Sequence, residues 1–373
     1  MTTVQAGLDG VVVAETELSD VDGEYGELIV RGYAIEDLVG RVTFEDACAL
    51  LWTGRLPDAE GRATWRSRFG AARREAYATV PSLGDAFVRP DGMDALRAAL
   101  AHLSPTGDLL ADTVMVTAAS AVFAAAWARR QRDQSLVAPD ASLSHAADYL
   151  RMIGGRHPEP ANVGGVDAYL CCVIDHGLNA STLAARVVAS TGSDLISAVV
   201  AGVGALKGPL HGGAPGPVLD MLDAIGTPER SGAWLRDRLA SGERIMGMGH
   251  RIYRVRDPRA AALERVAARL EAEGVGGARL SLARAVEREA ETLLEQRYPN
   301  RHLRANVEFY TAVLLEAVGI PRSLFSPTFA VSRVAGWSAH YDEQRRRGRL
   351  MRPLSKYVGP RPVSERGTAP VCQ

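Results

Sequence analysis

Two histidines in Gly- and Pro-punctuated loops, and a third just before a helix start, are the first residues of this 373-residue chain that could do chemistry. His211 lies in KGPLHGGAPGPVLDML, just ahead of a predicted helix that starts near Pro215 or Pro217. The positive end of that helix would disfavour a cation, so a neutral imidazole that donates a hydrogen bond to a carbonyl oxygen is expected. A turn histidine without a task is the alternative that this segment leaves open.

His250 lies in GMGHRIYRVRDPRAAAL. Asp257 and Pro258 are predicted to be the N-cap and first position of the next helix, which places Arg259 in its first turn. Arginines bind carboxylate or phosphate groups bidentately, so a histidine among them suits an anionic substrate. A solvated basic loop is the competing interpretation. The segment carries three further basic residues, Arg251, Arg254 and Arg256.

His176, in IDHGLNASTLAARVV, precedes another helix start at residues 179–181. It is also consistent with an ordinary histidine beside a helix cap. The three histidines do not indicate a metal site, because no two of them lie four apart on a helix and they are 35 and 39 residues apart. No metal is therefore expected.

Glu308, in RANVEFYTAVLLEAVGIP, is the acid of interest. Asn306 is a plausible N-cap, which would place Glu308 in the first turn of a helix. Desolvation by apolar neighbours would raise the pKa of the carboxyl group and make it a better base, although the helix dipole opposes this. On spacing alone, an acid favoured at a helix start is the better interpretation.

The elements that must position these residues are mainly helices. Strand patterns are confined to residues 10–14 and 26–30, and the length suits two domains. The predicted fold class is therefore mainly α, with a small N-terminal β element. Apolar residues three and four apart predict helices at residues 44–54, 91–103, 109–130, 142–153, 181–190, 194–206 and 260–272.

Composition narrows the function classes. With 43 basic and 44 acidic side chains and a net charge of −1, no global field would draw the chain to nucleic acid or to an anionic membrane. Residues 109–128 are long enough to span a bilayer, but they include Asp112 and several hydroxyl side chains, so a buried helix is expected. The cysteine spacing and the absence of a signal-peptide pattern favour a reducing cytoplasm.

Several segments together resemble the citrate synthase family. In the family's order they are GLDGVVVAETELSDVDGEYGELIVRGYAIEDL, DHGLNASTLAARVVASTGSDL, KGPLHGGA, GMGHRIYRVRDPR, NVEFYTAVLLEAVGIP and FAVSRVAGWSAHYDEQ. The resemblance is faint from about Asp58 to Gly165 and absent after Gly359. It implies a two-domain helical fold, in which residues 1–212 and 320–373 form a large domain and residues 213–319 a small one that closes over the active site.

The resemblance implies condensation of acetyl-CoA with oxaloacetate and water to give citrate and CoA, through a base-generated enol and hydrolysis of citryl-CoA. No cofactor is implied, because the acyl-CoA is a substrate. A homodimer with a subunit-shared active site is implied as well. 2-Methylcitrate synthase, which uses propionyl-CoA, is the nearest alternative, since one methylene shifts preference by only about 1 to 3 kcal/mol. A non-catalytic paralogue that senses oxaloacetate or CoA is the alternative from another class.

The family's roles can be carried over position by position. His211 resembles the histidine that stabilises the enol of acetyl-CoA, and His250 the one that polarises or protonates the oxaloacetate carbonyl. The base position holds Glu308, where the family usually has aspartate in NVD, and DHE likewise reads DHG at Gly177. Oxaloacetate-binding positions are matched by His176, Arg259, Arg333 and Arg352, the last supplied by the partner subunit. CoA-binding positions are matched by Arg254, Gly247 and Gly249.

The extra methylene of Glu308 has a physical consequence. It displaces the carboxylate by roughly 1 Å, and such a shift can cost on the order of a hundredfold in a positioned reaction. Because every other catalytic position is filled, a compensating shift of the local backbone is expected.

Overall fold

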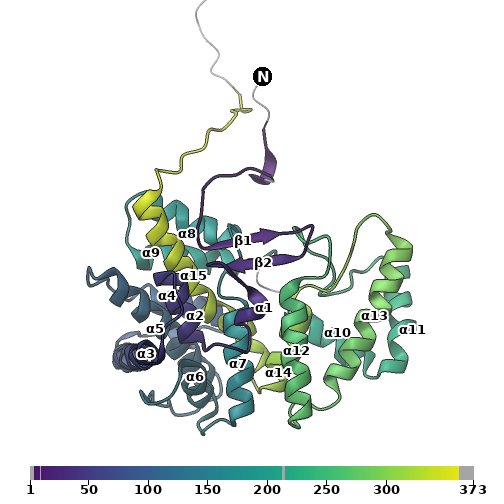
Figure 1. Cartoon of the computed structure of the whole chain (residues 1–373), viewed down its shortest axis with the longest axis horizontal. Coiled ribbons are helices and arrows are strands. Elements are labelled where there is room, and N and C mark those ends of the chain that lie inside the picture. The colour runs from purple at the N-terminus through teal and green to yellow at the C-terminus, as the bar shows by residue number, and fades with distance from the viewer. Residues whose placement is uncertain (1–3, 9, 212–214, 361–373) are drawn as a thin grey trace, which may run out of the picture.

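The computed structural model describes residues 4–8, 10–211 and 215–360, and helices dominate it (Figure 1). The predicted mainly α class is confirmed. After a single helical turn, α1 (Ile35–Leu38), the helices are α2 (Phe44–Thr53), α3 (Ala59–Thr79), α4 (Gly92–Leu100), α5 (Leu109–Arg130), α6 (His145–Gly154), α7 (Pro160–Cys172), α8 (Ala180–Ser190), α9 (Leu195–Leu206), α10 (Pro215–Ile225), α11 (Ser231–Ala240), α12 (Pro258–Ala272), α13 (Arg279–Arg297), α14 (Val307–Ala317) and α15 (Phe325–Arg347).

Short polar side chains begin many of these helices by accepting the first backbone N–H groups. The caps include Asp91, Asp108, Ser144, Asn179 and Asp194, which start α4, α5, α6, α8 and α9. Each of the seven predicted helices is present with its ends within three residues of the prediction. The local signals of periodicity and capping were therefore sufficient for these elements.

The β element is a small antiparallel sheet of β1 (Ser19–Asp22), β2 (Glu27–Val30) and β3 (Tyr33–Ala34), in that order. The strand predicted at residues 26–30 is β2. The strand predicted at residues 10–14 is wrong: this segment has no strand structure, because an extended apolar run forms a strand only where a neighbour pairs with it. β1 was missed because its sequence, SDVD, is rich in aspartate, which strands disfavour.

Helix α5 is the apolar segment that could have been taken for a membrane span. It is long and apolar enough by composition, but 78% of its most apolar window is buried within the protein. The prediction of a buried helix is confirmed. It packs against α3, α4, α6 and α15, and so forms part of the core.

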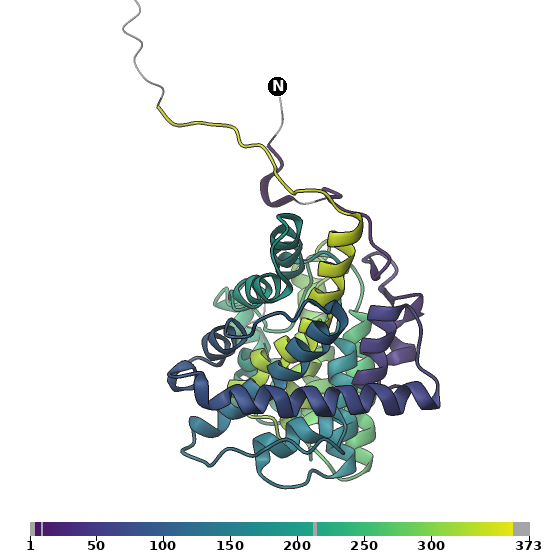
Figure 2. The ribbon, with the colours of Figure 1, turned by 90° about the vertical axis from the view of Figure 1, so that its left-hand side faces the viewer.

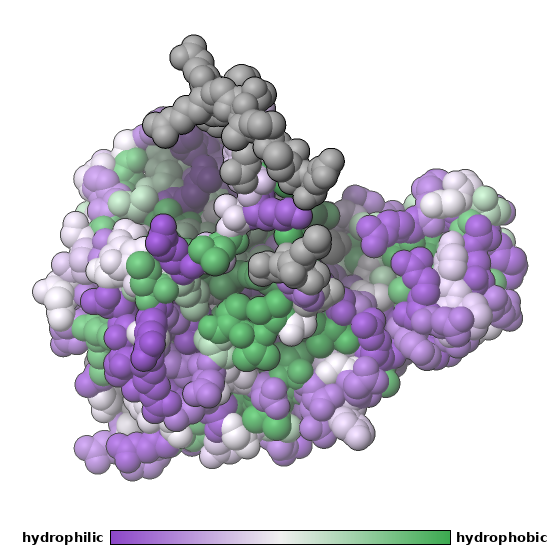
Figure 3. Space-filling model, turned by 90° about the horizontal axis from the view of Figure 1, so that it is seen from above, coloured by the Kyte–Doolittle hydropathy of each residue, from purple (hydrophilic) through white to green (hydrophobic). Residues whose placement is uncertain are grey.

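The second central helix is α15, which packs against α5, α8 and α9 and runs through the larger part of the molecule (Figure 2). Among the helices between α7 and α15 in the chain, α12 packs against α14 and also against α7, and α11 packs against α13. In Figure 1, α10, α11 and α13 lie apart from α2 to α6, on the right. Seen from above, this smaller part has a largely hydrophilic surface (Figure 3). The division at residues 212 and 213 remains a prediction, and it lies outside the described residues.

Candidate active site

His176 sits in a tight turn that follows α7. The Ser19 hydroxyl accepts a hydrogen bond from the Gly177 N–H (2.9 Å) and donates one to Asp175 Oδ2 (2.5 Å), so β1 holds the turn from one side. Gly177 has a φ of +58°, and a Cβ there would lie 3.2 Å from Val21 Cγ2. The left-handed backbone explains why this chain has glycine at that position. The His176 side chain is consequently fixed and nearly fully buried.

His250 has a defined protonation state. Its Nδ1 accepts hydrogen bonds from the backbone N–H groups of Ile252 and Tyr253, both at 3.1 Å. Because a backbone N–H can only donate, the ring proton must reside on Nε2. Burial, followed by the nearby Arg259 guanidinium, lowers the pKa of His250 to about 4. The imidazole is therefore neutral at physiological pH and carries one hydrogen-bond donor, Nε2–H.

Tyr253 joins two of the histidines, and sequence reasoning did not identify it. Its hydroxyl lies 3.1 Å from His176 Nε2, and its ring centroid lies 4.8 Å from that of His250. The two imidazole centroids are 5.6 Å apart. Burial, with the positive charge of Arg259 next, lowers the pKa of His176 well below its usual value. No motif in the sequence indicated that this buried tyrosine would link them.

His211 is contacted by a helix N-terminus, although not by the expected one. Helix α10 does begin at Pro215, as predicted, but the contact comes from the first turn of α8. The Ser181 N–H donates to His211 Nε2 (3.3 Å), and the Ser181 hydroxyl lies 2.8 Å from the same atom. Trp337 Nε1 in turn donates to that hydroxyl (3.1 Å). Burial lowers the pKa of His211 to about 4, so this imidazole is also neutral.

Glu308 is placed by the start of α14. Asn306 caps the helix, as predicted, by accepting from the Glu308 N–H (3.0 Å), and its amide donates to the Gly249 carbonyl (2.8 Å). The Gly247 carbonyl accepts the Asn306 N–H (2.9 Å). One residue thus ties the helix that carries Glu308 to the loop that carries His250.

Asp257 makes a second connection between the same elements. It caps α12, as predicted, by accepting from the Arg259 N–H (3.0 Å), and its other oxygen accepts from the Val307 N–H (3.1 Å). The starts of α12 and α14 therefore share one buried carboxylate. This arrangement fixes Arg259 and Glu308 relative to each other.

The Glu308 carboxyl group has the properties of a base. Its Oε2 atom is buried and has no hydrogen-bond partner among the described residues. Burial raises the pKa of Glu308 to about 7, against the opposing effect of the Arg259 charge. Near neutral pH this carboxyl group can both take up and release a proton, which is the requirement for a general base.

Arg333, on α15, is a buried guanidinium with an unused donor. Its Nε donates to the Val173 carbonyl (2.7 Å), whereas its Nη2 has no hydrogen-bond partner in the part of the chain that the structure describes. Burial lowers the pKa of Arg333 to about 10, so it stays charged. A buried cation with an open donor favours an incoming anion, and a carboxylate fits its planar group.

The other predicted arginines lie in different environments. Arg259 is buried and makes a bidentate ion pair with Asp257 (3.0 and 2.8 Å). Arg256, a further basic residue of that segment, is paired within the fold with Glu264 and Glu287 (both 2.8 Å). Arg254 is exposed at the rim of the His250 loop, and Arg352 is exposed in the segment after α15.

The predicted CoA-binding glycines have a clear backbone role. Gly247 and Gly249 have φ values of +74° and +89°, and a Cβ at Gly247 would lie 2.9 Å from Phe309 Cδ2. Both flank the bridge between Met248 and Ala305. Glycine is therefore required where the His250 loop passes close to the start of α14.

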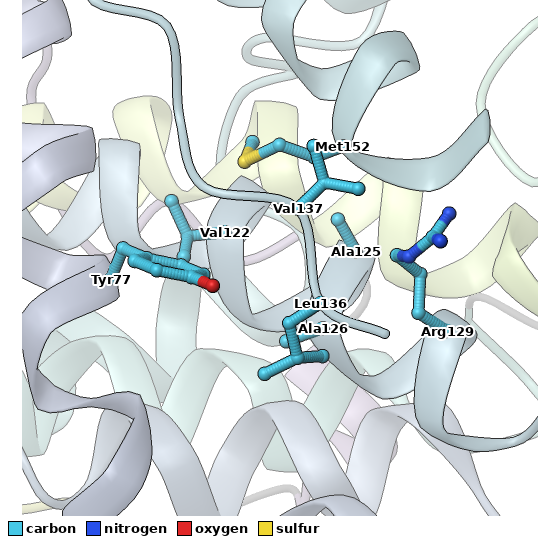
Figure 4. Close-up of a pocket in the computed structure, with 8 residues that line it drawn as sticks. All are labelled: Tyr77, Val122, Ala125, Ala126, Arg129, Leu136, Val137 and Met152. Carbon is cyan, nitrogen blue, oxygen red and sulfur yellow. The ribbon is translucent and has the colours of Figure 1, made fainter. Parts of the chain in front are cut away.

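A small pocket elsewhere does not compete with this site. It lies between α3, α5 and α6, is lined mostly by apolar side chains, and is too narrow to admit a water molecule (Figure 4). The Arg129 guanidinium at its edge already donates to the Ile153 carbonyl (3.1 Å). It is a packing gap.

Comparison with known proteins identifies the family of the chain. Residues 7–354 match the family described as "Citrate synthase, C-terminal domain". The chain belongs to the citrate synthase family. The citrate synthase of Haloferax volcanii is 38% identical and covers 97% of this chain and 99% of its own length. The 2-methylcitrate synthase of Mycobacterium tuberculosis is 36% identical over 95% of this chain and 91% of its own.

A solved structure shows that the likeness extends to the whole fold. It is the ternary complex of carboxymethyl coenzyme A and oxaloacetate with citrate synthase from Thermoplasma acidophilum, which has a TM-score of 0.86 and 26% identity. The alignment covers 100% of this chain and 99% of that one. This citrate synthase family member therefore has the family fold over its full described length.

Proposed function

We propose that this chain catalyses the condensation of acetyl-CoA with oxaloacetate and water to give citrate and CoA. The observation that carries the proposal is the set of neutral imidazoles and unpartnered charged groups in one site. Glu308 offers a buried carboxylate oxygen and Arg333 a buried guanidinium nitrogen, both without a partner among the described residues. His250 offers an Nε2–H. This reaction requires a base, a hydrogen-bond donor that polarises the carbonyl group, and a group that binds the anionic substrate.

The proposed reaction begins with removal of a proton from the methyl group of the thioester by Glu308. His211 donates a hydrogen bond to the thioester oxygen as negative charge develops there, and a neutral donor suits an enol better than a cation does. The enol carbon then attacks the oxaloacetate carbonyl carbon, whose oxygen is polarised by a hydrogen bond from His250 Nε2–H. The resulting alkoxide takes up one proton, and Glu308 gives up the proton that it removed, so the charges balance. Water hydrolyses the citryl thioester and releases CoA. No cofactor is needed.

Oxaloacetate is proposed to be held by His176, Arg259 and Arg333, with Arg352 of the partner subunit completing the set. Support for a shared site comes from the segment that follows α15, which runs away from the body in Figures 1 and 2. Arg352 lies on this segment and is exposed, as are the apolar side chains of Leu354 and Val358. We propose that a second copy of the chain covers this segment, and that the enzyme is a cytoplasmic homodimer.

CoA is proposed to bind beside the His250 loop. Arg254 is exposed there and can pair with a phosphate group. The adenine is proposed to lie along the backbone of Gly247 and Gly249. Closure of residues 213–319 over the larger domain would exclude water during bond formation.

Thiol release with oxaloacetate, measured in parallel with acetyl-CoA and propionyl-CoA, tests the proposal. Acetyl-CoA is expected to have the higher kcat/KM. A much higher value with propionyl-CoA would instead make the enzyme a 2-methylcitrate synthase, an alternative favoured by the 36% identical relative of that name. Turnover no greater than that of a His211→Ala variant would indicate a ligand-binding paralogue without catalysis.

The raised pKa of Glu308 predicts a pH dependence. Because the base must be deprotonated and its pKa is about 7, kcat/KM for acetyl-CoA is expected to fall below neutrality, to about one tenth of its plateau one pH unit lower. His211 and His250, with pKa values of about 4, do not titrate in this range. Initial rates at saturating oxaloacetate and constant ionic strength provide the measurement. A midpoint in the ordinary range of glutamate, near about 4.3, would contradict the prediction.

A further inference from the structure

A buried row of polar side chains runs along one face of α15 and ends at the proposed oxaloacetate site. Arg333, Gly336, His340 and Glu343 follow one another at spacings of three and four residues, so they share one side of the helix. The three side chains in this row are almost completely buried. A row of buried charge inside a helix–helix contact is costly unless its members are paired and hydrogen-bonded, so their partners show what the row does.

The far end of the row is held by fixed partners. Arg186, on α8, donates from Nη1 to Glu343 Oε2 (2.7 Å) and to His340 Nδ1 (2.8 Å). The other Glu343 oxygen accepts the backbone N–H of Glu17 (2.8 Å). Because a guanidinium can only donate, His340 Nδ1 accepts and its ring proton resides on Nε2. His340 thus presents a single donor toward the active site.

That donor faces Asp175, the residue before His176. His340 Nε2 lies 3.2 Å from both Asp175 oxygens and has hydrogen-bond geometry toward Oδ2, which also accepts from the Ser19 hydroxyl. Burial raises the pKa of Asp175, but the His340 and Arg333 contributions outweigh it and the net pKa is lowered, so the carboxylate is charged. Both of its hydrogen-bonding neighbours engage the same oxygen.

The other Asp175 oxygen lies close to Arg333 without bonding to it. Asp175 Oδ1 and Arg333 Cδ both lie beside Gly336, 2.8 and 3.4 Å from the position of a Cβ there. Neither Asp175 Oδ1 nor Arg333 Nη2 has a hydrogen-bond partner among the described residues. The two groups carry opposite charges, and the Asp175 charge opposes the effect of burial on the pKa of Arg333, so they attract each other. Some contact must therefore hold the carboxylate in place, and the hydrogen bonds to Oδ2 do so.

We propose that His340 is a positioning residue for oxaloacetate: its hydrogen bond to Asp175 holds that carboxylate away from Arg333 and leaves Nη2 open to a carboxylate of the substrate. This proposal depends on the proposed function in one respect: it takes oxaloacetate as the ligand of Arg333. Without His340, Asp175 would swing onto Arg333 and occupy the donor. The loss would affect oxaloacetate and not acyl-CoA.

The test compares oxaloacetate binding, by titration calorimetry on the full chain, in His340→Leu and in a matched control, Ser332→Ala. Ser332 is equally buried on α15, and its hydroxyl donates to the Leu170 carbonyl (2.6 Å). His340→Leu is expected to raise the Kd for oxaloacetate at least about tenfold, whereas Ser332→Ala should change it less than about twofold. The KM for acetyl-CoA should be unchanged in both. Equal Kd values in the two variants would overturn the proposal.

A second substitution distinguishes electrostatic competition from damage to the fold. In His340→Leu with Asp175→Asn, the neutral amide no longer pairs with Arg333, so oxaloacetate affinity is expected to return to within about threefold of wild type. A double variant as weak as His340→Leu would refute the mechanism. If His340→Leu does not fold, Ser19→Ala removes the other hydrogen bond to Asp175 Oδ2 and should also weaken oxaloacetate binding, and an unchanged Kd would count against the proposal. A wild type that binds oxaloacetate but releases no thiol would refute the proposed function and leave this test valid.

Discussion

Replacing Glu308 by glutamine is expected to lower kcat for thiol release by about 10²- to 10⁴-fold while oxaloacetate still binds. Glutamine keeps the length and shape of the side chain but cannot accept the proton from the thioester methyl group. The capping contacts of Asn306 and Asp257 involve the backbone of α14, so they persist in the variant. Stopped-time thiol assays and calorimetry with oxaloacetate would separate the two effects.

Glu316→Gln is the matched control for this experiment. Glu316 lies on the same helix, but its carboxylate pairs with Arg279 (2.7 Å) and Arg322 (3.4 Å) outside the site. This substitution should leave kcat within about twofold of wild type. The ion pairs of Glu316 are partly exposed to solvent, and such pairs contribute little even to the stability of the fold. If Glu308→Gln retained turnover comparable with that of the control, Glu308 would be removed from the mechanism.

The capping contacts also bear on the extra methylene of Glu308. The start of α14 is fixed by Asn306 to Gly247 and Gly249, and by Asp257 to α12. Such contacts set how far the helix, and with it the carboxylate, stands from the imidazoles. The predicted compensation for the longer side chain remains a prediction, and these contacts mean that it would have to act at the start of α14.

Sequence predicted the parts of the site that depend on neighbours in the chain. The caps at Asp257 and Asn306 were recognisable because an N-cap and its helix are contiguous. The helix that contacts His211 was not, because Ser181 lies 30 residues away and nothing local indicates that α8 would supply it. The ion pairs of Arg256 could not be predicted for the same reason, since one of its partners, Glu287, belongs to a different helix.

The fold shows the same division between local and distant causes. The predicted helices agree with those of the structure, because periodicity and caps depend on residues that are close in the sequence. The extended residues 10–14 and strand β1 did not, because a strand depends on a pairing partner and the aspartates of β1 conceal its pattern. Tyr253 and Asp175 make their contacts with His176 and His340 only in the folded chain. Composition and spacing therefore could not predict them.

Replacing Arg333 by methionine is expected to raise the Kd and KM for oxaloacetate roughly 10²- to 10³-fold, the loss that follows when one partner of a buried charge pair is removed. Methionine fills similar volume without charge. In the free enzyme the substitution removes the hydrogen bond from Nε to the Val173 carbonyl, the contact of the guanidinium with the Phe329 ring and the attraction to Asp175. The melting temperature should nevertheless fall only modestly, because the substitution also removes the cost of burying Nη2, which has no hydrogen-bond partner among the described residues.

Arg73→Met provides the opposite control. Arg73 is equally buried, but its Nε pairs with Asp148 (2.7 Å) and its Nη2 donates to the Leu143 carbonyl (2.8 Å). Removing it takes one of two arginine partners from the buried Asp148 carboxylate, which Arg151 still contacts at 3.0 Å, and this should cost about 1 to 3 kcal/mol of stability without changing the KM for oxaloacetate. If Arg333→Met instead lowered stability as much as Arg73→Met and left substrate affinity intact, Arg333 would be a structural residue. The contrast tests whether this site gains its affinity from a charge that the fold leaves unpaired.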